Sequence, residues 1–305
     1  MTTTYDSVGN AEDFKDAIFD TKTIDTPYMN IAKKAKATGK LHEWQQRDLT
    51  AAGDNAVVEG DDNPTKTYTP TVLRSNRVQL MDKAFKISDT LEEIKKHGRK
   101  SELRDQSAVK LRELKNDGEH AMTGMPTQAA VAGDGSSTAA RMAGLAGQVH
   151  ADNRVDHSGD GGTTATKFTA ANGEASIKKG QLAAYNSGGN PDTLLINPEH
   201  ADAIAGFAQQ TGRNRDIEDK RLVDCIDIID TPHGSLSVVK GRFMDSTTIL
   251  GIDSEYADVA VLQPAKLKTL AVTGHSQPMM WKWEGCGDVL NNKTWFVIDH
   301  IDPAA

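Results

Sequence analysis

Residues 98–122 carry the clearest periodic pattern in the chain, and this pattern constrains the fold more than any other segment. Apolar or small residues recur there at spacings of three and four: Leu103, Ser107, Leu111, Leu114, Gly118 and Met122. Such spacing places them on one face of a helix, which at 1.5 Å per residue is about 37 Å long. The apolar face is thin, so we expect the helix to lie along a sheet on one side and to be solvated on the other.

The segment 46–88 predicts a long two-stranded hairpin with polar faces. Strand-like alternation occurs around Thr67–Thr69 and Val72–Val78, and the segment is punctuated by Gly53, Gly60, Pro64 and Pro70. A two-stranded ribbon is only marginally stable alone in water. We therefore expect this ribbon to lie on a surface that it does not itself provide.

Residues 1–45 are typical of an arm with short helices. Asn10 followed by Asp13 resembles a capping box, with an apolar stripe of Phe14, Ala17 and Ile18 behind it. Thr26 and Pro27 mark a second helix start, whose apolar side would hold Tyr28, Ile31 and Ala35. Helices this short are unstable in isolation, so the arm must contact its own body or another subunit.

The remainder of the chain alternates loops, helices and strands. Residues 173–186 predict a helix, and Asn197 with Pro198 begins another, with Ala201, Ile204, Ala205 and Ala208 facing inward. Strands are expected at residues 193–196, 225–229, 235–239, 247–252, 259–262, 268–272, 278–283 and 295–298. Helices layered on sheets within one chain indicate an α+β fold.

Composition narrows the class of protein. Aromatic residues make up only 5% of the 305 residues, which favours an extended subunit that completes its burial against neighbours, although an ordinary polar globular protein has a similar composition. The net charge of −8 argues against a freestanding nucleic-acid binder and suits a container for DNA. We interpret the cluster Lys33, Lys34, Lys36 and Lys40 as a solvated helix face.

Cysteine usage and the chain start indicate assembly in a reducing cytoplasm. Cys225 and Cys286 lie far apart without metal-ligand spacing, so neither a disulfide framework nor a zinc site is expected. The first residues lack the basic and apolar regions of a signal peptide, and no apolar run is long enough to span a membrane.

The sequence contains no catalytic, cofactor or metal constellation that we can identify. Residues 161–168 approach a phosphate-binding loop but place Phe168 where Ser or Thr must bind magnesium. The histidines are scattered singly, and Asp156 with Asp160 lacks the calcium-binding EF-hand pattern. Trp281 and Trp283 share one face of a strand and are expected to anchor a core or an interface.

An ordered set of short segments resembles the major capsid proteins of tailed bacteriophages, which have the Hong Kong 97-like shell fold. The segments are Asp13–Asp16 with Ile18, Asp25–Tyr28, Lys34–Ala37, His42–Trp44, Gly98–Leu103, Glu113–Lys115 with Asp117, Arg141–Leu145 and Leu270–Ser276. The resemblance covers nearly the whole chain. Gly285, Cys286 and Gly287 depart from the continuous β-rich run of that family, which leaves the local strand geometry open.

The resemblance implies an architecture and a function. Residues 1–45 would be an N-terminal arm, 46–88 an extended β-hairpin loop, 89–184 a peripheral domain with a spine helix at 98–122, 185–257 an axial domain with a central sheet and flanking helices, and 258–305 a return to the peripheral domain. The protein would self-assemble into hexamers and pentamers of an icosahedral head that encloses double-stranded DNA. A minor capsid or other virion assembly protein, and a cytosolic enzyme, remain as alternatives.

The same resemblance implies partners and contact residues. Expected partners are further copies of the chain, a scaffolding protein, a portal, a decoration protein, and packaged double-stranded DNA through weak non-specific contact, without a membrane. Some relatives join subunits by an isopeptide, for which Lys66 and either Asn291 or Asn292 are candidates. The candidate inter-subunit contacts are Phe14, Ile18, Tyr28, Trp44, Tyr68, Val72, Arg74, Arg99, Lys100 and Glu102.

Overall fold

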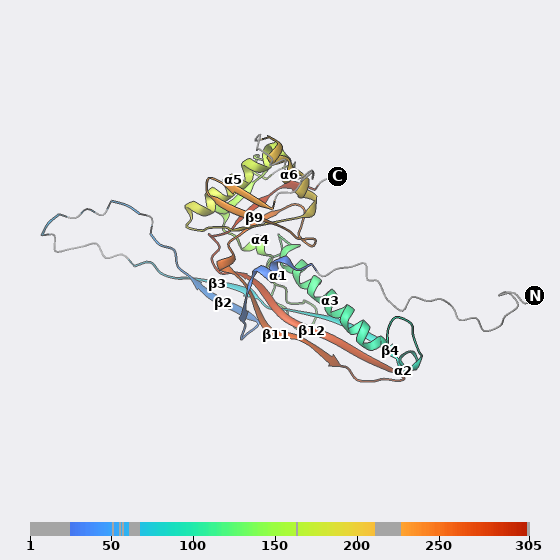
Figure 1. Ribbon diagram of the computed structural model, residues 1–305. Helices are drawn as coiled ribbons and strands as arrows, with labels where there is room; N and C mark the ends of the chain where they lie inside the picture. The colour runs from blue at the N-terminus through green and yellow to red at the C-terminus, as the bar shows by residue number, and fades with distance from the viewer. Residues whose placement is uncertain are drawn as a thin grey trace, which may run out of the picture. The chain divides into compact units, whose positions relative to one another are not determined.

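A computed structural model describes residues 25–50, 52–54, 56, 58–60, 68–162, 164–210 and 227–303 (Figure 1). The predicted capping box at Asn10, the contact candidates Phe14 and Ile18, Lys66, and Cys225 lie outside these residues. Within the described ranges, no helix combines the length and the apolar character needed to cross a bilayer.

The helices and strands alternate along the chain, as Figure 1 labels them. The α-helices are α1 (Pro27–Ile31), α2 (Asp89–Glu93), α3 (Glu102–Thr123), α4 (Leu145–Gln148), α5 (Ala170–Asn186) and α6 (Ala201–Gln210). The strands are β1 (Lys33–Lys36), β2 (Leu41–Gln46), β3 (Val72–Arg77), β4 (Gln79–Ser88), β5 (Arg154–Asp156), β6 (Thr166–Lys167), β7 (Thr193–Ile196), β8 (Ile228–Thr231), β9 (Gly234–Lys240), β10 (Ile249–Ile252), β11 (Ala257–Thr269), β12 (Ser276–Val289), β13 (Phe296–Asp299) and β14 (Ile301–Asp302). Short 3₁₀ turns lie at Ala151–Asn153, Pro198–His200 and Ser254–Tyr256.

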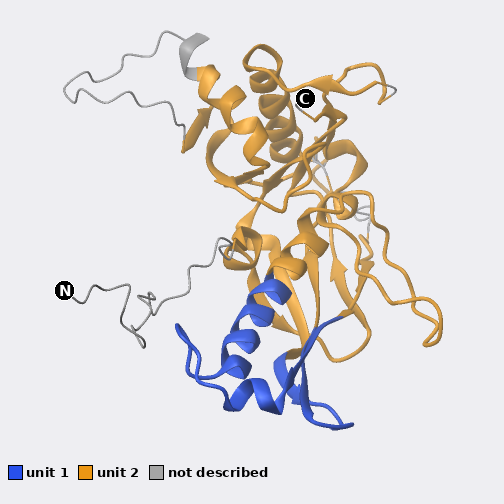
Figure 2. Ribbon diagram, turned by 90° about the vertical axis from the view of Figure 1, so that its right-hand side faces the viewer, with its two compact units in different colours: residues 1–24, 81–115, 265–283 blue, residues 25–80, 116–264, 284–305 orange. Residues whose placement is uncertain are grey.

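The described chain divides into two compact units, which Figure 2 colours separately. Unit 1 contains residues 81–115 and 265–283, and unit 2 contains residues 25–80, 116–264 and 284–305, apart from those outside the described ranges. Helix α3 and the long strands β11 and β12 contribute residues to both units.

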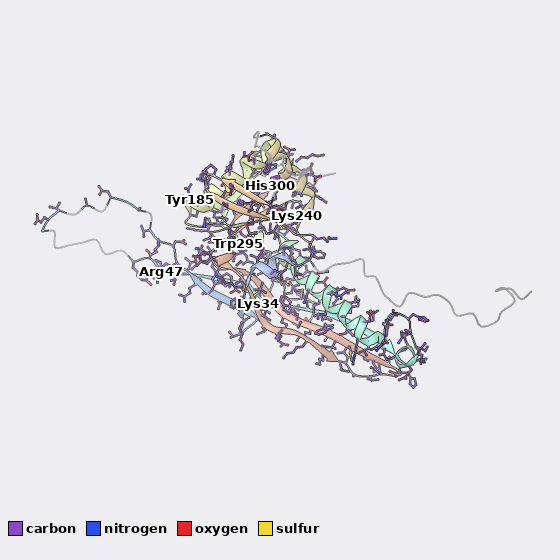
Figure 3. The ribbon with its side chains drawn as sticks, viewed as in Figure 1. Lys34, Arg47, Tyr185, Lys240, Trp295 and His300 are labelled. Carbon is purple, nitrogen blue, oxygen red and sulfur yellow. The ribbon has the colours of Figure 1, made fainter. Side chains whose placement is uncertain are left out.

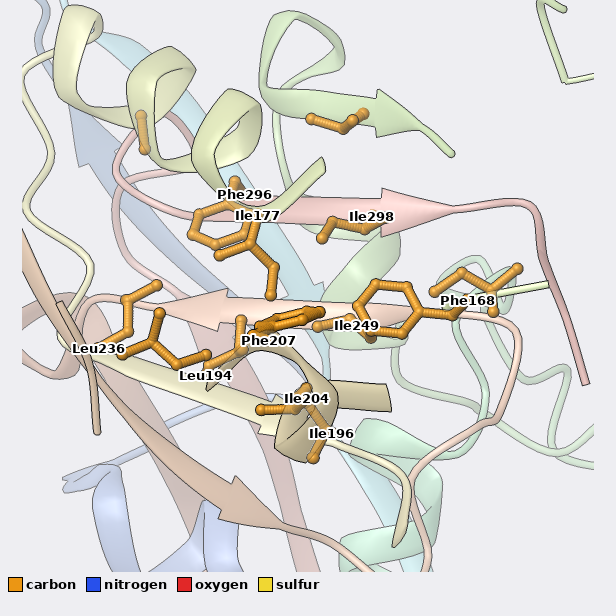
Figure 4. Close-up of a cluster of buried hydrophobic side chains, with 14 residues drawn as sticks. Phe168, Ile177, Leu194, Ile196, Ile204, Phe207, Leu236, Ile249, Phe296 and Ile298 are labelled. Atoms are coloured by element: carbon orange, nitrogen blue, oxygen red, sulfur yellow. The ribbon is translucent and has the colours of Figure 1, made fainter. Parts of the chain in front are cut away.

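The core of unit 2 surrounds a six-stranded mixed sheet in the order β5-β13-β10-β7-β9-β8. Strand β13 is antiparallel to β10 and parallel to β5, and β7 is parallel to β9. Helices α5 and α6 contact each other, and α5 contacts β13. Figure 4 shows the buried side chains between them, including Phe168, Ile177, Ile204, Phe207 and Phe296. This layer of helix on sheet confirms the expected α+β class.

Two glycines admit the ring of Phe296 into this core. A Cβ at Gly180 in α5 would lie 2.4 Å from the ring, and one at Gly251 in β10 would lie 2.0 Å from it. Because real Cβ atoms do not approach other heavy atoms so closely, both positions require glycine for this packing.

Strands β2 and β3 form an antiparallel pair of their own, in register from Leu41 opposite Arg77 to Gln46 opposite Val72. The first strand therefore begins upstream of residue 46, inside the segment expected to belong to the arm. Strand β4, expected within the hairpin segment, instead joins a second sheet in the order β1-β11-β12-β4. The segment 46–88 thus contributes strands to two sheets.

Two further expectations about the arm are wrong. Helix α1 ends at Ile31, so Ala35 is not on it, and Lys33–Lys36 is a strand that pairs parallel with β11. The lysines at 33, 34 and 36 accordingly lie on a strand, where the pairing with Asp258–Val261 overrides the absence of an alternating pattern.

Helix α3 confirms the long predicted helix, but it begins at Glu102 rather than at residue 98. The carboxylate of Glu92 accepts the backbone N–H groups of Glu102 at 2.9 Å and Leu103 at 3.3 Å, which satisfies two otherwise free donors at the helix start. In unit 1, the indole Nε1 of Trp281 donates to the carbonyl of Ser107 at 2.9 Å. The expected anchoring role of this tryptophan is confirmed.

The C-terminal strands are longer than the sequence suggests. Strand β11 contains the predicted strand 259–262 and continues to Thr269, the second residue of the predicted strand 268–272, and β12 is continuous through Gly285, Cys286 and Gly287. A Cβ at Gly287 would lie 2.7 Å from the sulfur of Met122. At this position, glycine therefore permits close packing of the strand against α3 and does not interrupt the strand.

Candidate functional site

The two faces of the β2–β3 hairpin have different environments. Side chains alternate between the faces of a strand, so His42, Trp44 and Gln46 share one face with Asn76, Arg74 and Val72. On this covered face only Val72 is exposed. The opposite face carries Leu41, Glu43, Gln45, Leu73, Ser75 and Arg77, of which all but Arg77 are exposed. We call these six residues the outer face of the hairpin.

The covered face is fixed to the chain by side-chain hydrogen bonds. The amide of Asn76, 1% exposed, donates to the carbonyl of Gly287 at 2.8 Å and accepts the N–H of Ala143 at 2.9 Å. The indole Nε1 of Trp44 donates to the carbonyl of Leu290 at 2.9 Å. These contacts hold the hairpin through one face only, so its outer face is available to another molecule.

An ion pair lies at the end of the anchored part of the hairpin, which we call its root (strands β2 and β3). Lys293 contacts the carboxylate of Asp48 at 2.9 Å, and the pKa of Asp48 is lowered by its hydrogen bonds from Lys293 and Gln46. Arg47, labelled in Figure 3, is exposed where the chain leaves strand β2 for the loop. From this point the chain enters the loop 47–71, of which residues 51, 55, 57 and 61–67 lie outside the described ranges.

A buried carboxyl group lies beneath the hairpin root. Asp288 is fully buried, 3.8 Å from the imidazole of His42, and accepts a hydrogen bond from the thiol of Cys286. Burial raises the pKa of Asp288 to about 6, while the neighbouring His42 opposes this rise. Burial and the Asp288 charge raise the pKa of the Cys286 thiol well above its ordinary value, which disfavours the nucleophilic thiolate form.

Large apolar side chains are exposed along the hairpin and its loop. Their exposed fractions are 39% for Leu41, 93% for Leu49, 80% for Val58, 80% for Tyr68, 50% for Val72 and 59% for Leu73. Exposed apolar residues that gather on one segment are typical of a surface that binds another protein. The candidate site is therefore the surface made of the outer face and the described part of the loop.

The predicted contact residues fall into three groups. Tyr68 and Val72 are exposed on the hairpin segment, and Lys100 is exposed before α3. Trp44, Arg74 and Arg99 are half-buried, with Trp44 and Arg99 bonded within the chain.

Tyr28 and Glu102 are buried in their own chain, which contradicts their expected place on a subunit contact. The hydroxyl of Tyr28 donates to the carbonyl of Asp258 at 3.0 Å, and Tyr28 is 0% exposed. Glu102 is 5% exposed and is paired with Arg99. Asn292, one candidate acceptor for an isopeptide, is only 4% exposed and so is inaccessible to a lysine of another chain.

The sequence analysis named Arg99 and Lys100 as candidate contacts but did not recognise the basic loop 94–101 between α2 and α3 as a whole. A depression of about 450 Å³ is lined there by Lys95, Lys96, Gly98, Arg99 and Lys100. The run Lys95-Lys96-His97-Gly98-Arg99-Lys100 was visible in the sequence, and it is denser in charge than the cluster at residues 33–40. Gly98 adopts a φ of 79°, a conformation that favours glycine and turns this loop back on itself.

Acidic and histidine side chains in the described ranges do not gather into a metal site of three or more ligands. Asp156, considered above for calcium, instead accepts the backbone N–H groups of Ser158, Gly161 and Gly162, which closes a tight turn. The hydrogen bond from the Ser158 hydroxyl lowers the pKa of Asp156, and the backbone hydrogen bonds lower it further.

Comparison with known proteins identifies the family. The family described as SU10 major capsid protein matches residues 1–302. The major capsid protein of Escherichia phage Phieco32 is 28% identical over 321 residues, covering 92% of this chain and 91% of that protein.

Solved structures share the fold. A chain of Microbacterium phage Oxtober96 has a TM-score of 0.67 at 10% identity, covering 95% of this chain and 96% of the other. The structure of phage G, solved with major capsid and decoration proteins, gives a TM-score of 0.58 at 9% identity, covering 97% of this chain and 99% of the other. The fold is the Hong Kong 97-like capsid fold, and the protein is a structural component of the head of a tailed phage. With a match that spans residues 1–302, the chain belongs to the SU10 major capsid protein family.

Proposed function

We propose that copies of this major capsid protein join into hexamers and pentamers of an icosahedral head, and that the β2–β3 hairpin of each copy lies on a neighbour. The observation that supports this most directly is the difference between the hairpin faces. One face is bonded to the chain through Asn76 and Trp44, while Leu41 and Leu73 on the outer face remain exposed. A second copy would bury these side chains, at about 25 cal/mol per Å² of apolar surface.

Many weak contacts suit a closed shell better than a few strong ones. A contact of about −4 kcal/mol has a millimolar dissociation constant, so a misplaced subunit can dissociate and rebind. Once a subunit is held at several edges, the contacts act together and the shell becomes stable. Head-to-tail contacts around five-fold and six-fold axes close into rings without a free edge.

We assign the parts of the chain to this shell as follows. Residues 1–45 form the arm and 46–88 the extended loop, except that β2 belongs structurally with the hairpin. Residues 89–184 and 258–305 form the peripheral domain with α3 as its spine, and residues 185–257 form the axial domain. The six-stranded sheet of unit 2 contributes β7, β8, β9 and β10 to the axial part and β5 and β13 to the peripheral part.

Further partners follow from the role of a head protein. We infer a scaffolding protein that guides assembly, a portal, and a decoration protein of the kind solved with the phage G head. Packaged double-stranded DNA would be enclosed with weak, non-specific contact, because the chain carries a net charge of −8 and a strongly basic inner wall would retain the DNA.

Deletion of residues 53–70 tests the role of the hairpin loop. The strand pairs from Leu41–Arg77 to Gln46–Val72 lie outside the deletion, so the core of unit 2 should fold and melt as in the full chain. Closed heads should be absent from electron micrographs of cells that express the variant with its phage assembly genes. A matched control deletes residues 134–137, another exposed loop, and should still give heads. Normal heads from the 53–70 deletion would refute the proposal.

A further inference from the structure

The loop 47–71 between β2 and β3 carries more acidic than basic residues, with its basic residues Arg47 and Lys66 near its ends, whereas the loop between α2 and α3 is basic. Five acidic residues and no basic ones occur between residues 48 and 65: Asp48, Asp54, Glu59, Asp61 and Asp62. Of the described members, Asp48 is paired with Lys293, whereas Asp54 and Glu59 are exposed. Neither Asp54 nor Glu59 has an ion pair within the described residues.

The basic loop 94–101 also has two cations left over after its internal pairs are counted. Lys96 contacts the carboxylate of Glu92 at 3.8 Å, and Arg99 is paired with Glu102. Glu92 and Glu102 are themselves engaged in the start of helix α3. Lys95 and Lys100 are exposed and have no ion pair in the described part of the chain, although both line the depression.

Apolar side chains flank both charged sets. Val58 is 80% exposed beside Glu59, while Leu91 and Ile94 are 41% and 57% exposed on the side of α2 that leads into the basic loop. A surface that combines an apolar centre with charges of one sign fits a partner with the opposite sign and its own apolar centre. The two loops therefore match each other in both respects.

We propose that the acidic loop of one copy, through Asp54, Val58 and Glu59, docks on the basic loop of a second copy, at Lys95 and Lys100. This inference rests on the proposed function, because it names the receiving surface for the loop of the hairpin. The depression is occupied by a carboxylate-bearing segment of another copy of the same protein. An assembly therefore contains as many acidic loops as depressions. Each copy both donates one loop and receives one.

Charge reversal tests the pairing with full-length chain. One variant carries Asp54→Lys and Glu59→Lys, and the other carries Lys95→Glu and Lys100→Glu. Each variant alone should raise the subunit concentration at which shells form, followed by light scattering in 50 mM NaCl, by about tenfold, since two attractive pairs become repulsive. Lys179→Glu, at an exposed position on α5, is the matched control and should leave this threshold unchanged.

Mixing the two variants identifies the second copy as the occupant. The reversed loop of one variant is complementary to the reversed surface of the other, so an equimolar mixture should lower the threshold below that of either variant alone. Recovery should be partial, because a ring of five subunits cannot alternate the two variants completely. The chain that carries all four substitutions should assemble normally as well. Raising NaCl to 500 mM should reduce the difference between each single variant and the unaltered chain, because exposed charges are screened.

Four results would overturn the inference or part of it. Unchanged thresholds in both variants would show that these loops do not pair. Recovery in the fourfold variant without recovery in the mixture would place the contact within one chain. Loss without recovery in either would assign the basic loop to a different anionic partner. Altered melting of the unassembled variants would attribute the loss to folding. Failure of the 53–70 deletion to block heads, by contrast, would refute the proposed function itself.

Discussion

The Oε1 atom of Glu119 accepts the backbone N–H of Tyr28 at 2.7 Å, and this contact fixes the start of α1 against the last turns of α3. The second carboxylate oxygen accepts the N–H of Met29 at 3.1 Å. Glu119 is 1% exposed, and burial raises its pKa to about 7, although both hydrogen bonds favour the ionised form. A carboxyl group therefore titrates here close to neutral pH.

The raised pKa predicts that stability falls as pH rises. Between the ordinary pKa of 4.5 and a value near 7, the folded chain keeps a proton on Glu119 that the unfolded chain has released. The free energy of unfolding should therefore decrease by up to about 3 kcal/mol between pH 4.5 and 8. Asp288, with a pKa of about 6, contributes in the same direction.

Urea unfolding of unassembled chain at a series of pH values measures this decrease. Glu119→Gln should flatten the dependence, while Glu113→Gln on the exposed side of the same helix should not. A stability that increases with pH across this range would contradict the assignment.

Glycine to alanine changes around Phe296 should be strongly destabilising. Alanine is favoured over glycine in a helix by about 1 kcal/mol, so Gly180→Ala would stabilise α5 if space allowed. The Cβ would lie 2.4 Å from the ring, or 2.0 Å in Gly251→Ala, and overpacking of this kind costs about 3 kcal/mol. In both variants the free-energy cost of the clash should exceed any gain from replacing glycine, so both should be less stable than the unaltered chain.

Thermal unfolding checks this order of effects. Gly53→Ala is the control, because nothing lies within 4 Å of its Cβ position, and its melting temperature should not fall. Phe296→Leu should recover part of the loss in the Gly251→Ala background. If Gly180→Ala melted higher than the unaltered chain, the close approach to Phe296 would be disproved.

Trp281→Phe should separate the hydrogen bond of this residue from its packing. The indole Nε1 donates to the Ser107 carbonyl at 2.9 Å and lies 3.1 Å from the Ser107 hydroxyl, so phenylalanine keeps most of the apolar area and loses the donor. The expected cost is about 1 kcal/mol, measured as a lower urea midpoint with an unchanged slope. Ser107→Ala, which retains the carbonyl, should cost less, and equal costs would contradict the geometry.

Asn76→Ala should loosen the root of the hairpin. The change removes the donor to the Gly287 carbonyl and leaves the N–H of Ala143 without its partner, at a cost of about 2 kcal/mol. Amide hydrogen exchange at residues 72–77 should accelerate more than exchange in strand β13. Ser75→Ala on the outer face is the control and should change neither. Uniform acceleration throughout unit 2 would mean that the effect is not local.

Sequence patterns predicted the elements that need only some apolar surface to pack against, whichever residues provide that surface. The spacing of Leu103, Leu111 and Leu114 was sufficient for α3, because an apolar stripe needs only some surface to cover it. The strand at Lys33–Lys36 could not be predicted in this way. It is set by pairing with Asp258–Val261, far along the chain, and four residues with three lysines carry no strand signal of their own.

Only part of the candidate site could be predicted from the sequence, because the burial of some of its residues depends on partners far along the chain. Tyr28, Tyr68 and Val72 were all predicted as contacts from the family resemblance, and in the structure Tyr68 and Val72 are exposed whereas Tyr28 is buried. Its burial depends on Glu119 and Asp258, which no local pattern connects to it. The basic residues of the loop 94–101 can be read from the sequence, but the depression that they line depends on the turn at Gly98.

The alternation of the hairpin faces also limits where the length of this protein can change. One residue inserted after Leu41 in strand β2 would turn every following side chain of that strand to the opposite side. Trp44 and Gln46 would then face outward, and Glu43 and Gln45 would face the contacts that Trp44 and Gln46 now make. An insertion between residues 47 and 71 would only enlarge a loop, whose closure entropy grows slowly with size. Members of the family that differ in length here should therefore have gained or lost residues in the loop and kept both strands intact.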